Sequence, residues 1–310
     1  MPGLERVAFL LSCIAFVIAV AIAGVLAPPL QHRGLAGAAR WIRRASRTAI
    51  VLLAAGVLCL GYALFIEADW LEVTPVRVES AKLPAGTHLT IALVSDLHVD
   101  RDTRALIALR DELTDRPVDL VVFTGDAINR KDAVTLFRAT MVALGGRLGR
   151  AAVKGNHDVV RWRDVELFSG VATELLSDRP LVLDDHLALC GAPYGSPELV
   201  ESCLSAAPEH AFTLFAYHSP DLIEDLQHRP DLYLAGHTHG GQVRLPFFGA
   251  LITFSQHDKK YEAGRYEVDG TTLVVSRGVG FEPGFPRVRF LCRPQVVRVE
   301  LVGTGAPRPE

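Results

Sequence analysis

Two long apolar stretches open the chain, and shorter apolar runs follow them. Val7–Ala27 contains Ser12 as its one clear polar interruption, and Ala49–Ile66 contains no charged residue. Each stretch is close to the ~20 residues that cross a bilayer core as a helix. Buried core helices are the alternative, although such helices usually keep some polar positions. We therefore predict two membrane-spanning helices that form a hairpin.

From about Thr87 onward, short apolar runs alternate with longer stretches of helical periodicity. The predicted strands are Leu89–Val94, Leu120–Phe123, Ala151–Val153, Leu181–Leu183, Phe212–Ala216, Leu232–Ala235, Thr272–Val275 and Val296–Leu301. The predicted helices are Thr103–Leu113, Ala133–Leu144, Pro197–Leu204 and Pro220–Gln227. This alternation predicts an α/β domain with helices covering the sheet faces. We expect a membrane anchor over residues 1–70, a linker over 71–86, the α/β domain over 87–302 and a tail over 303–310.

Charge is distributed unevenly along the chain. Residues 1–66 contain one acidic residue and six arginines, so the net charge of −3 for the whole chain places −8 on the remainder. The predicted loop 28–48 contains five of those arginines: Arg33, Arg40, Arg43, Arg44 and Arg47. Short arginine-rich loops stay in the cytoplasm. A hairpin with this loop inside predicts a multi-pass inner-membrane protein whose C-terminal domain lies outside the cytoplasm.

Two alternatives for the N-terminus also lead to export. The first stretch could be a cleaved signal peptide with Val25-x-Ala27 as its small-residue site, although its apolar run is long for that role. Arg43-Arg44 resembles part of a twin-arginine signal.

The acidic remainder of the chain argues against a nucleic-acid partner. Five scattered cysteines do not indicate a disulfide scaffold.

Polar side chains follow five of the predicted strands directly. Ligand sites in open α/β sheets form where strands end at their carboxyl edge. The residues at these ends are Asp96, His98, Asp126, Asn156, His157, Asp158, His218, His237 and His239. Taken singly, an Asp-x-His or a lone histidine is a weak signal. Together, the five strand ends predict one shared site.

The chemistry of this set indicates metal binding. Apart from His157 and Asp158, the set consists of two aspartates, one asparagine and four histidines, which supply oxygen and nitrogen ligands of intermediate hardness. Such ligands suit Mn, Fe or Zn better than Ca or Mg, which prefer oxygen alone. Seven ligands exceed what one ion with open positions needs. We therefore expect two divalent ions that share a bridging carboxylate.

The ordered blocks Asp-x-His, Gly-Asp, Gly-Asn-His-Asp, a lone His and Gly-His-x-His resemble the calcineurin-like metallophosphoesterase family. The likeness extends over roughly Thr87 to Leu301 and is strongest to the membrane-associated bacterial phosphodiesterase branch. It implies a two-sheet sandwich flanked by helices. Purple acid phosphatases of this superfamily have a tyrosine three residues after the bridging aspartate. Asn129 stands there in this chain, which argues against a tyrosinate-bound iron.

The resemblance also implies individual roles. Asp96, His98 and His239 would hold one metal, Asn156, His218 and His237 the other, and Asp126 would bridge both. His157 would be the general acid and phosphate contact. Asp158 would either orient His157 or serve as a helix cap. Arg130, Arg277 and Arg287 are candidate phosphate contacts, although the simpler interpretation is that they are solvated loop residues.

The predicted function is hydrolysis of a phosphate ester, most simply a phosphodiester, by metal-activated water at a membrane. The substrate would be a phosphorylated small molecule or a lipid-linked phosphate. One alternative is a pyrophosphatase acting on a nucleotide-linked acyl sugar, which needs a cytoplasmic site. Another is a non-catalytic, metal-dependent sensor of a phosphorylated ligand. The apolar run Pro246–Ile252 is either a buried strand or a surface that touches the bilayer or a lipid substrate.

Overall fold

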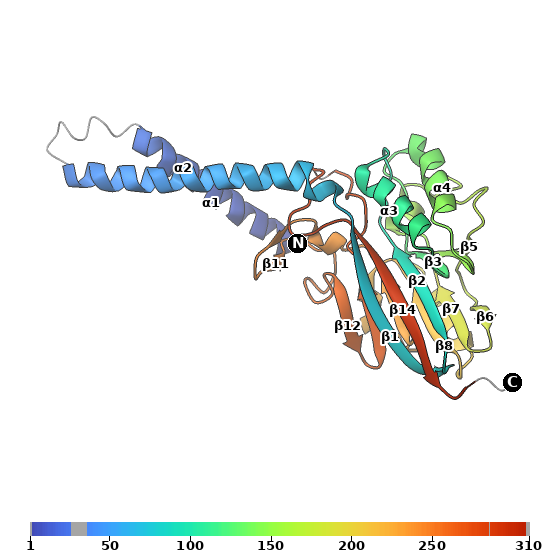
Figure 1. Cartoon of the computed structure of the whole chain (residues 1–310). Helices are drawn as coiled ribbons and strands as arrows, with labels where there is room; N and C mark the ends of the chain where they lie inside the picture. Colours follow the sequence, from blue (N-terminus) through green and yellow to red (C-terminus); the bar gives the residue numbers. More distant parts are fainter. Residues whose placement is uncertain (1, 26–35, 285, 308–310) are drawn as a thin grey trace. The chain divides into compact units, whose positions relative to one another are not determined.

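The computed structural model describes residues 2–25, 36–284 and 286–307. The chain forms two compact units, Met1–Ile66 and Glu67–Glu310 (Figure 1). Each unit has its own internal packing and is described separately below.

The first unit consists of two helices, α1 (Pro2–Val25) and α2 (Ala36–Phe65). They pack against each other, and Ser46 Oγ donates a hydrogen bond to the carbonyl oxygen of Ala21 at 3.0 Å. Among the described residues, one helical segment, Arg40–Asp69, is long and apolar enough to cross a membrane, and a shorter apolar segment is Leu11–Ala23. The first predicted span is therefore not confirmed at its full length.

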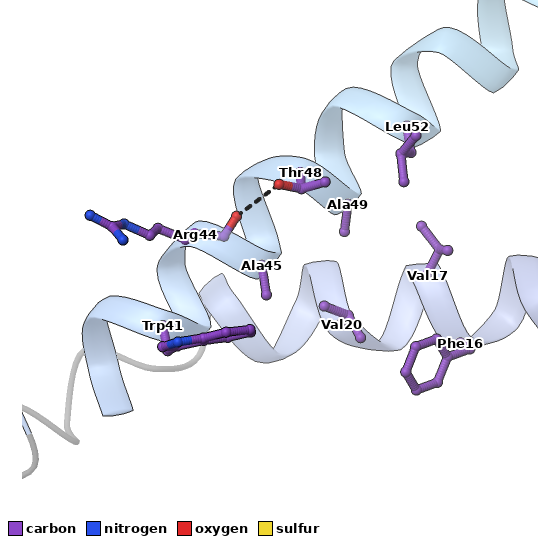
Figure 2. Close-up of a pocket in the computed structure, with 9 residues that line it drawn as sticks. All are labelled: Phe16, Val17, Val20, Trp41, Arg44, Ala45, Thr48, Ala49 and Leu52. Carbon is purple, nitrogen blue, oxygen red and sulfur yellow. Dashed lines mark hydrogen bonds between the residues drawn. The ribbon is translucent and has the colours of Figure 1, made fainter. Parts of the chain in front are cut away.

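The predicted arginine-rich loop is wrong over much of its length. Helix α2 begins at Ala36, so four of the arginines lie on its first turns: Arg40, Arg43, Arg44 and Arg47. These residues are good helix formers, and the apolar run that follows continues the same helix. Arg33 lies outside the described residues. A groove between α1 and α2 is lined on one side by Trp41, Ala45 and Leu52, as Figure 2 shows.

The second unit contains two six-stranded sheets. In spatial order, the first sheet consists of β1 (Glu72–Pro84), β14 (Gln295–Gly305), β2 (His88–Val94), β3 (Leu120–Phe123), β4 (Gly149–Ala152) and β5 (Glu174–Leu175). The second sheet consists of β12 (Gly264–Val268), β13 (Thr271–Val275), β9 (Leu232–Ala235), β8 (Phe212–Ala216), β7 (Leu187–Gly191) and β6 (Leu181–Asp184). Strands β2–β5 run parallel to one another, and so do β7, β8, β9 and β13. The prediction of an α/β fold with two sheets is confirmed.

The sheets face each other across a continuous apolar core. Leu93 and Val122 of the first sheet and Leu214 and Leu234 of the second belong to this core, and each is essentially inaccessible to solvent. Helices α3 (Arg104–Asp115) and α4 (Val134–Ala143) cover the outer face of the first sheet. Helix α6 (Pro197–Ala206) covers that of the second. Because both faces of the central strands are buried, these strands are largely apolar.

The predicted linker over 71–86 is wrong, because most of it is strand β1. This strand pairs in parallel with β14 at the edge of the first sheet. Pro75 is compatible with an edge strand, where one side of the backbone needs no ladder partner. β14 also extends through Gly305, beyond the predicted start of the tail. Of the predicted helix Pro220–Gln227, the structure forms a 3₁₀ turn, η4, over Pro220–Glu224.

The apolar run Pro246–Ile252 is a surface hairpin at its start and is buried at its end. β10 (Arg244–Leu245) and β11 (Gly249–Ala250) pair antiparallel. Phe247, in the turn between them, is fully exposed, whereas Ala250 and Leu251 are buried. A single buried strand over the whole run is therefore excluded.

Cys190 and Cys203 form a disulfide that joins β7 to α6. The bond was not predicted, because a spacing of 13 residues matches no short cysteine motif. It fixes the helix to the outer face of the second sheet.

Candidate metal centre

The predicted site residues occupy the carboxyl ends of strands in both sheets. β2 and β3 of the first sheet end before Asp96 and Asp126, and β8 and β9 of the second end before His218 and His237. Five of the predicted ligands adopt positive φ angles: Asp96, His98, Asp126, His237 and His239. Positive φ is uncommon for residues other than glycine and clusters at functional sites. The strand ends thus turn sharply and direct these side chains into one region.

Close packing of glycines against the carboxylates shapes the site. A Cβ atom added to Gly236 would collide with Ser95 Oγ and with the Asp96 carboxylate. One added to Gly155 would collide with Asp126. Each carboxylate therefore rests against a backbone that has no side chain at that point.

We expect Gly236→Ala to weaken Mn²⁺ binding and to lower kcat/KM by about tenfold, because the added methyl group displaces Asp96. Titration calorimetry of the metal-free protein measures the first effect. Gly56→Ala is the control, since an added Cβ there meets no atom within 4 Å. Equal affinities in both variants would contradict the assignment of Asp96 as a ligand.

Two overlapping groups of side chains have the spacing that a metal ion needs. The ligand atoms of Asp96, His98 and His239 lie within 4.8 Å of one another, and so do those of Asp96, Asp126 and His218. All five residues are buried. The first group is the set predicted for one metal. The second group shares Asp96 with the first.

Asp126 lies between histidines of the two groups. Its Oδ2 atom is 3.5 Å from His98 Nε2 and 3.3 Å from His218 Nε2. The other carboxylate oxygen accepts a hydrogen bond from the His157 backbone N–H at 2.9 Å. This placement is compatible with the predicted bridging role.

The remaining predicted ligands border the second group. His237 Nδ1 lies 3.1 Å from His218 Nε2, and the His237 backbone N–H donates to the Asp96 carboxylate. Asn156 is the first residue of the short helix α5 (Asn156–Val160), and its Oδ1 atom is buried without a hydrogen-bond partner among the described residues.

The histidine tautomers leave nitrogen atoms free for a metal. His218 Nδ1 lies 2.8 Å from the Thr124 carbonyl oxygen, which can only accept, so Nδ1 carries a proton. His98 Nδ1 lies 2.8 Å from Asn129 Oδ1. Within the described residues, His98 Nε2 and both ring nitrogens of His239 are buried and make no hydrogen bond. Buried polar atoms normally have partners, so these atoms fit a metal site.

Electrostatics within the site also fit metal binding. Burial lowers the pKa of His98 to about 4, and burial together with His218 lowers that of His237 to about 4. Burial acts in the same direction on His218, but the neighbouring Asp126 carboxylate raises its pKa to about 10. Burial opposes ionisation of Asp126, yet His218 and His98 hold its pKa well below the usual range. A proton must leave His218 before a metal binds, so affinity should rise with pH.

Asp158 is buried and holds two loops of the site together. Its carboxylate accepts hydrogen bonds from the backbone N–H groups of Asp126 (2.8 Å), Ala127 (2.9 Å) and Gly155 (2.9 Å). Burial and the charge of Asp126 raise its pKa to about 6, against these donors. No hydrogen bond between Asp158 and the His157 ring occurs in the described part of the chain. The geometry favours the cap interpretation of Asp158 over that of orienting His157.

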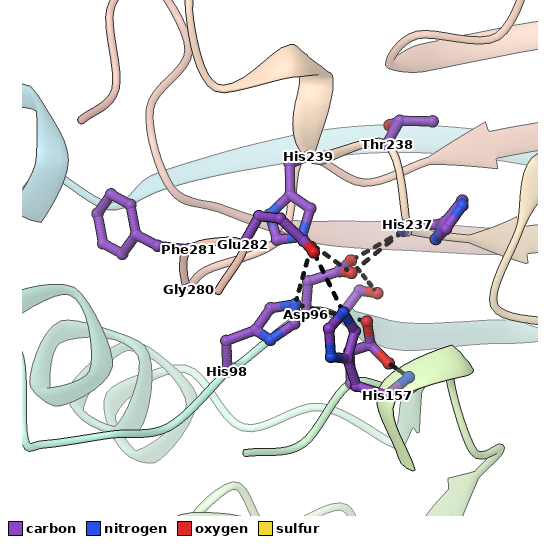
Figure 3. A network of polar contacts seen from close by, with 12 residues as sticks. Asp96, His98, His157, His237, Thr238, His239, Gly280, Phe281 and Glu282 are labelled. Atoms are coloured by element: carbon purple, nitrogen blue, oxygen red, sulfur yellow. Dashed lines mark hydrogen bonds and ion pairs between the residues drawn. The ribbon is translucent and has the colours of Figure 1, made fainter. Parts of the chain in front are cut away.

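His157 lies at the edge of the cluster beside Glu282, a residue that the sequence did not indicate. His157 Nε2 is 3.1 Å from Glu282 Oε1, and the two rings of His157 and His98 have centroids 5.2 Å apart (Figure 3). Burial lowers the pKa of His157, but the Glu282 hydrogen bond and the charge of Asp126 raise it by more. The pKa of His157 is thus raised, which is the direction that a general acid needs.

The three candidate arginines have carboxylate partners away from the metal ligands. Arg130 pairs with Asp132 at 2.6 Å, Arg277 with Glu72 at 3.0 Å, and Arg287 with Asp100 at 2.8 Å. No contact of these arginines with the metal ligands is recorded among the described residues. A phosphate-binding role would require them to leave these partners.

The sequence also missed Asn129 as a supporting residue. Asn129 contacts His98 Nδ1 and donates through Nδ2 to the Phe281 carbonyl oxygen at 2.9 Å. It therefore links His98, a predicted metal ligand, to the loop that carries Glu282. Its place three residues after Asp126 was visible in the sequence, whereas Glu282 does not directly follow a predicted strand.

The chain is similar to several known proteins. A family model described as calcineurin-like phosphoesterase matches residues 89–241. The uncharacterized metallophosphoesterase YkuE of Bacillus subtilis (strain 168) is 30% identical over 82% of this chain and 94% of its own. Phosphodiesterase YaeI of Escherichia coli (strain K12) is 29% identical over 78% and 92%. UDP-2,3-diacylglucosamine pyrophosphatase LpxG of Chlamydia trachomatis serovar D is 27% identical over 79% and 93%.

Proposed function

Because the chain belongs to the calcineurin-like metallophosphoesterase family, and is thus a metal-dependent phosphoester hydrolase, we propose that it is a binuclear phosphodiesterase held at a membrane. One observation carries the proposal. Two groups of buried ligands share Asp96, and atoms of His98 and His239 within them have no hydrogen-bond partner among the described residues.

In this proposal Asp96, His98 and His239 would hold one divalent ion, and His218, His237 and Asn156 would hold the other. Asp126 would serve both. The nitrogen-rich donor set favours Mn, Fe or Zn. When bound, two such ions polarise the phosphate and lower the pKa of a water that attacks phosphorus.

His157 supplies the proton in this mechanism. It lies beside the ligands, and its side chain is 16% exposed, so the ring borders the space that a substrate enters. Its Nε2–H would be donated to the leaving oxygen, and Glu282 keeps the ring oriented and protonated until then.

We expect His157→Ala to lower kcat for an alkyl phosphodiester about a hundredfold, and to lower it far less for bis-p-nitrophenyl phosphate. The nitrophenolate group leaves without protonation, whereas an alkoxide does not. Steady-state kinetics with both substrates measure the difference. A similar loss for both would indicate that His157 binds phosphate and does not transfer a proton.

Several features support a membrane location. Arg40–Asp69 is long and apolar enough to cross a bilayer, and we propose that α1 completes a two-helix anchor over the first 66 residues.

The arginines at the start of α2 would lie in the cytoplasm. Disulfides persist in oxidising compartments, so Cys190–Cys203 supports an extracytoplasmic domain. The exposed Phe247 supports a lipid-linked substrate or a bilayer contact.

A second candidate is pyrophosphate hydrolysis in a nucleotide-linked acyl sugar. The relative from Chlamydia trachomatis named as a UDP-2,3-diacylglucosamine pyrophosphatase supports it. That substrate requires a cytoplasmic site, which the arginine distribution and the disulfide argue against. A reporter fused after Glu310 would decide the membrane side.

The test of the proposed function is metal reconstitution of the full chain in detergent. We expect the metal-free protein to be inactive and Mn, Fe or Zn to restore hydrolysis of bis-p-nitrophenyl phosphate, while Ca restores little. UDP-2,3-diacylglucosamine serves as the comparison substrate. A folded protein that binds two ions per chain but hydrolyses no ester would favour the sensor alternative.

A further inference from the structure

Glu282 brings a third carboxylate to the metal centre. It lies in the loop that follows β13, far along the chain from the strand-end blocks. Its Oε2 atom is 3.4 Å from His239 Nε2 and 3.8 Å from His98 Nε2, while Oε1 is 3.1 Å from His157 Nε2. Figure 3 shows the side chain pointing into the space between these three rings. Glu282 therefore faces the nitrogen atoms that would bind the first metal.

The loop that carries Glu282 is fixed to the site by its backbone. The Gly280 N–H donates to the Asp96 carbonyl oxygen at 2.7 Å, and the Glu282 N–H donates to Gln242 Oε1 at 3.0 Å. The buried guanidinium of Arg289 donates to the carbonyl oxygen of Gly280 at 2.7 Å. These bonds fix the backbone from which the Glu282 side chain projects, because moving the loop would break several buried hydrogen bonds.

We infer that Glu282 determines specificity: its charge makes the metal centre accept singly charged phosphodiesters and reject doubly charged phosphomonoesters. The inference rests on the proposed function and deepens it. Two divalent ions carry four positive charges, of which Asp96 and Asp126 neutralise two. Glu282 neutralises a third positive charge, on the side of the site that faces His157. A monoester brings one more negative charge than a diester to this position.

Coulomb's law gives the scale of the discrimination. One additional charge roughly 5 Å from a carboxylate, at an effective dielectric constant of about 20, changes relative binding by a few hundredfold. The same charge also attracts the metals. Glu282 should therefore strengthen metal binding as well as select the substrate.

The test compares Glu282→Gln and Glu282→Asp with the wild-type full chain in detergent. Glutamine keeps the shape and removes the charge, whereas aspartate keeps the charge. Glu79→Gln is the control, because Glu79 is an exposed residue of β1 that pairs with Arg77 at 2.8 Å. The measurements are kcat/KM for p-nitrophenyl phosphate and bis-p-nitrophenyl phosphate, and Mn²⁺ affinity by calorimetry.

We expect Glu282→Gln to raise the ratio of monoester to diester kcat/KM at least about tenfold and to weaken Mn²⁺ binding by about tenfold. Glu282→Asp and Glu79→Gln should keep the wild-type ratio. An unchanged ratio in Glu282→Gln, or the same change in Glu282→Asp, would overturn the inference. Wild-type protein that hydrolyses neither ester would instead overturn the proposed function. Calorimetry would then still test Glu282, and unchanged Mn²⁺ affinity in Glu282→Gln would overturn its place at the metal centre.

Discussion

Asp126→Asn is expected to lower kcat/KM for phosphodiesters on the order of a thousandfold, the largest loss of activity from any single change in this site. Asp126 Oδ2 lies within 3.5 Å of histidines from both ligand groups. An amide is a poor bridging ligand, because it lacks the charge that holds two cations close together. In the proposed binuclear site, both ions would therefore depend on this carboxylate.

The substitution should leave the fold intact, since asparagine retains an oxygen that can accept from the His157 backbone N–H. Metal content by mass spectrometry and steady-state kinetics measure the effect, with circular dichroism to check folding. Asp102→Asn is the control, because Asp102 is an exposed residue that pairs with Arg110 at 2.8 Å. An Asp126→Asn variant that binds two ions and retains a tenth or so of the activity would refute the bridging role.

Asp158→Ala is expected to cause the largest loss of stability, about 3 kcal/mol or more in the metal-free protein. The change removes the acceptor of three buried backbone N–H groups, on Asp126, Ala127 and Gly155. Each donor would then be buried without a partner. A loss of this size corresponds to a fall in Tm of about 10 °C for a domain of this length.

Thermal unfolding of the metal-free full chain, followed by the fluorescence of its tryptophans, measures this loss. Asp158→Asn should show an intermediate effect, since it keeps one acceptor oxygen. Asp102→Asn again serves as the control. If Asp158→Ala unfolds at the wild-type temperature and loses only activity, the carboxylate acts on His157 and does not hold the two loops.

The order of the polar blocks in the sequence was enough to indicate the candidate ligands. Each block follows a strand whose apolar residues are contiguous, so the local pattern specifies both the strand and the turn after it. The bounds of Leu120–Phe123, Phe212–Ala216 and Leu232–Ala235 agree with the structure. Parallel strands expose their carboxyl ends at one edge, and this rule brings the blocks together.

Contacts between distant parts of the chain were not predictable in the same way. Glu282 and His157 are 125 positions apart, and Cys292 donates its backbone N–H to Glu67 across 225 positions. The sequence predicts a linker where the structure has β1, because the pairing of β1 with β14 is a contact between distant parts of the chain. The partners of Arg130, Arg277 and Arg287 depend on loop paths that no local periodicity encodes.

The sequence by itself thus determined the α/β class, the family likeness and the candidate ligands, because hydrophobic periodicity and strand-end chemistry are local properties. Only the tertiary structure decided which side chains surround these ligands. It brought Glu282 to the metal centre, bonded Asp158 to the backbone of two loops and joined Cys190 to Cys203. The physical reason is that such contacts form when loops from both sheets close over one core, and loop closure depends on the whole fold.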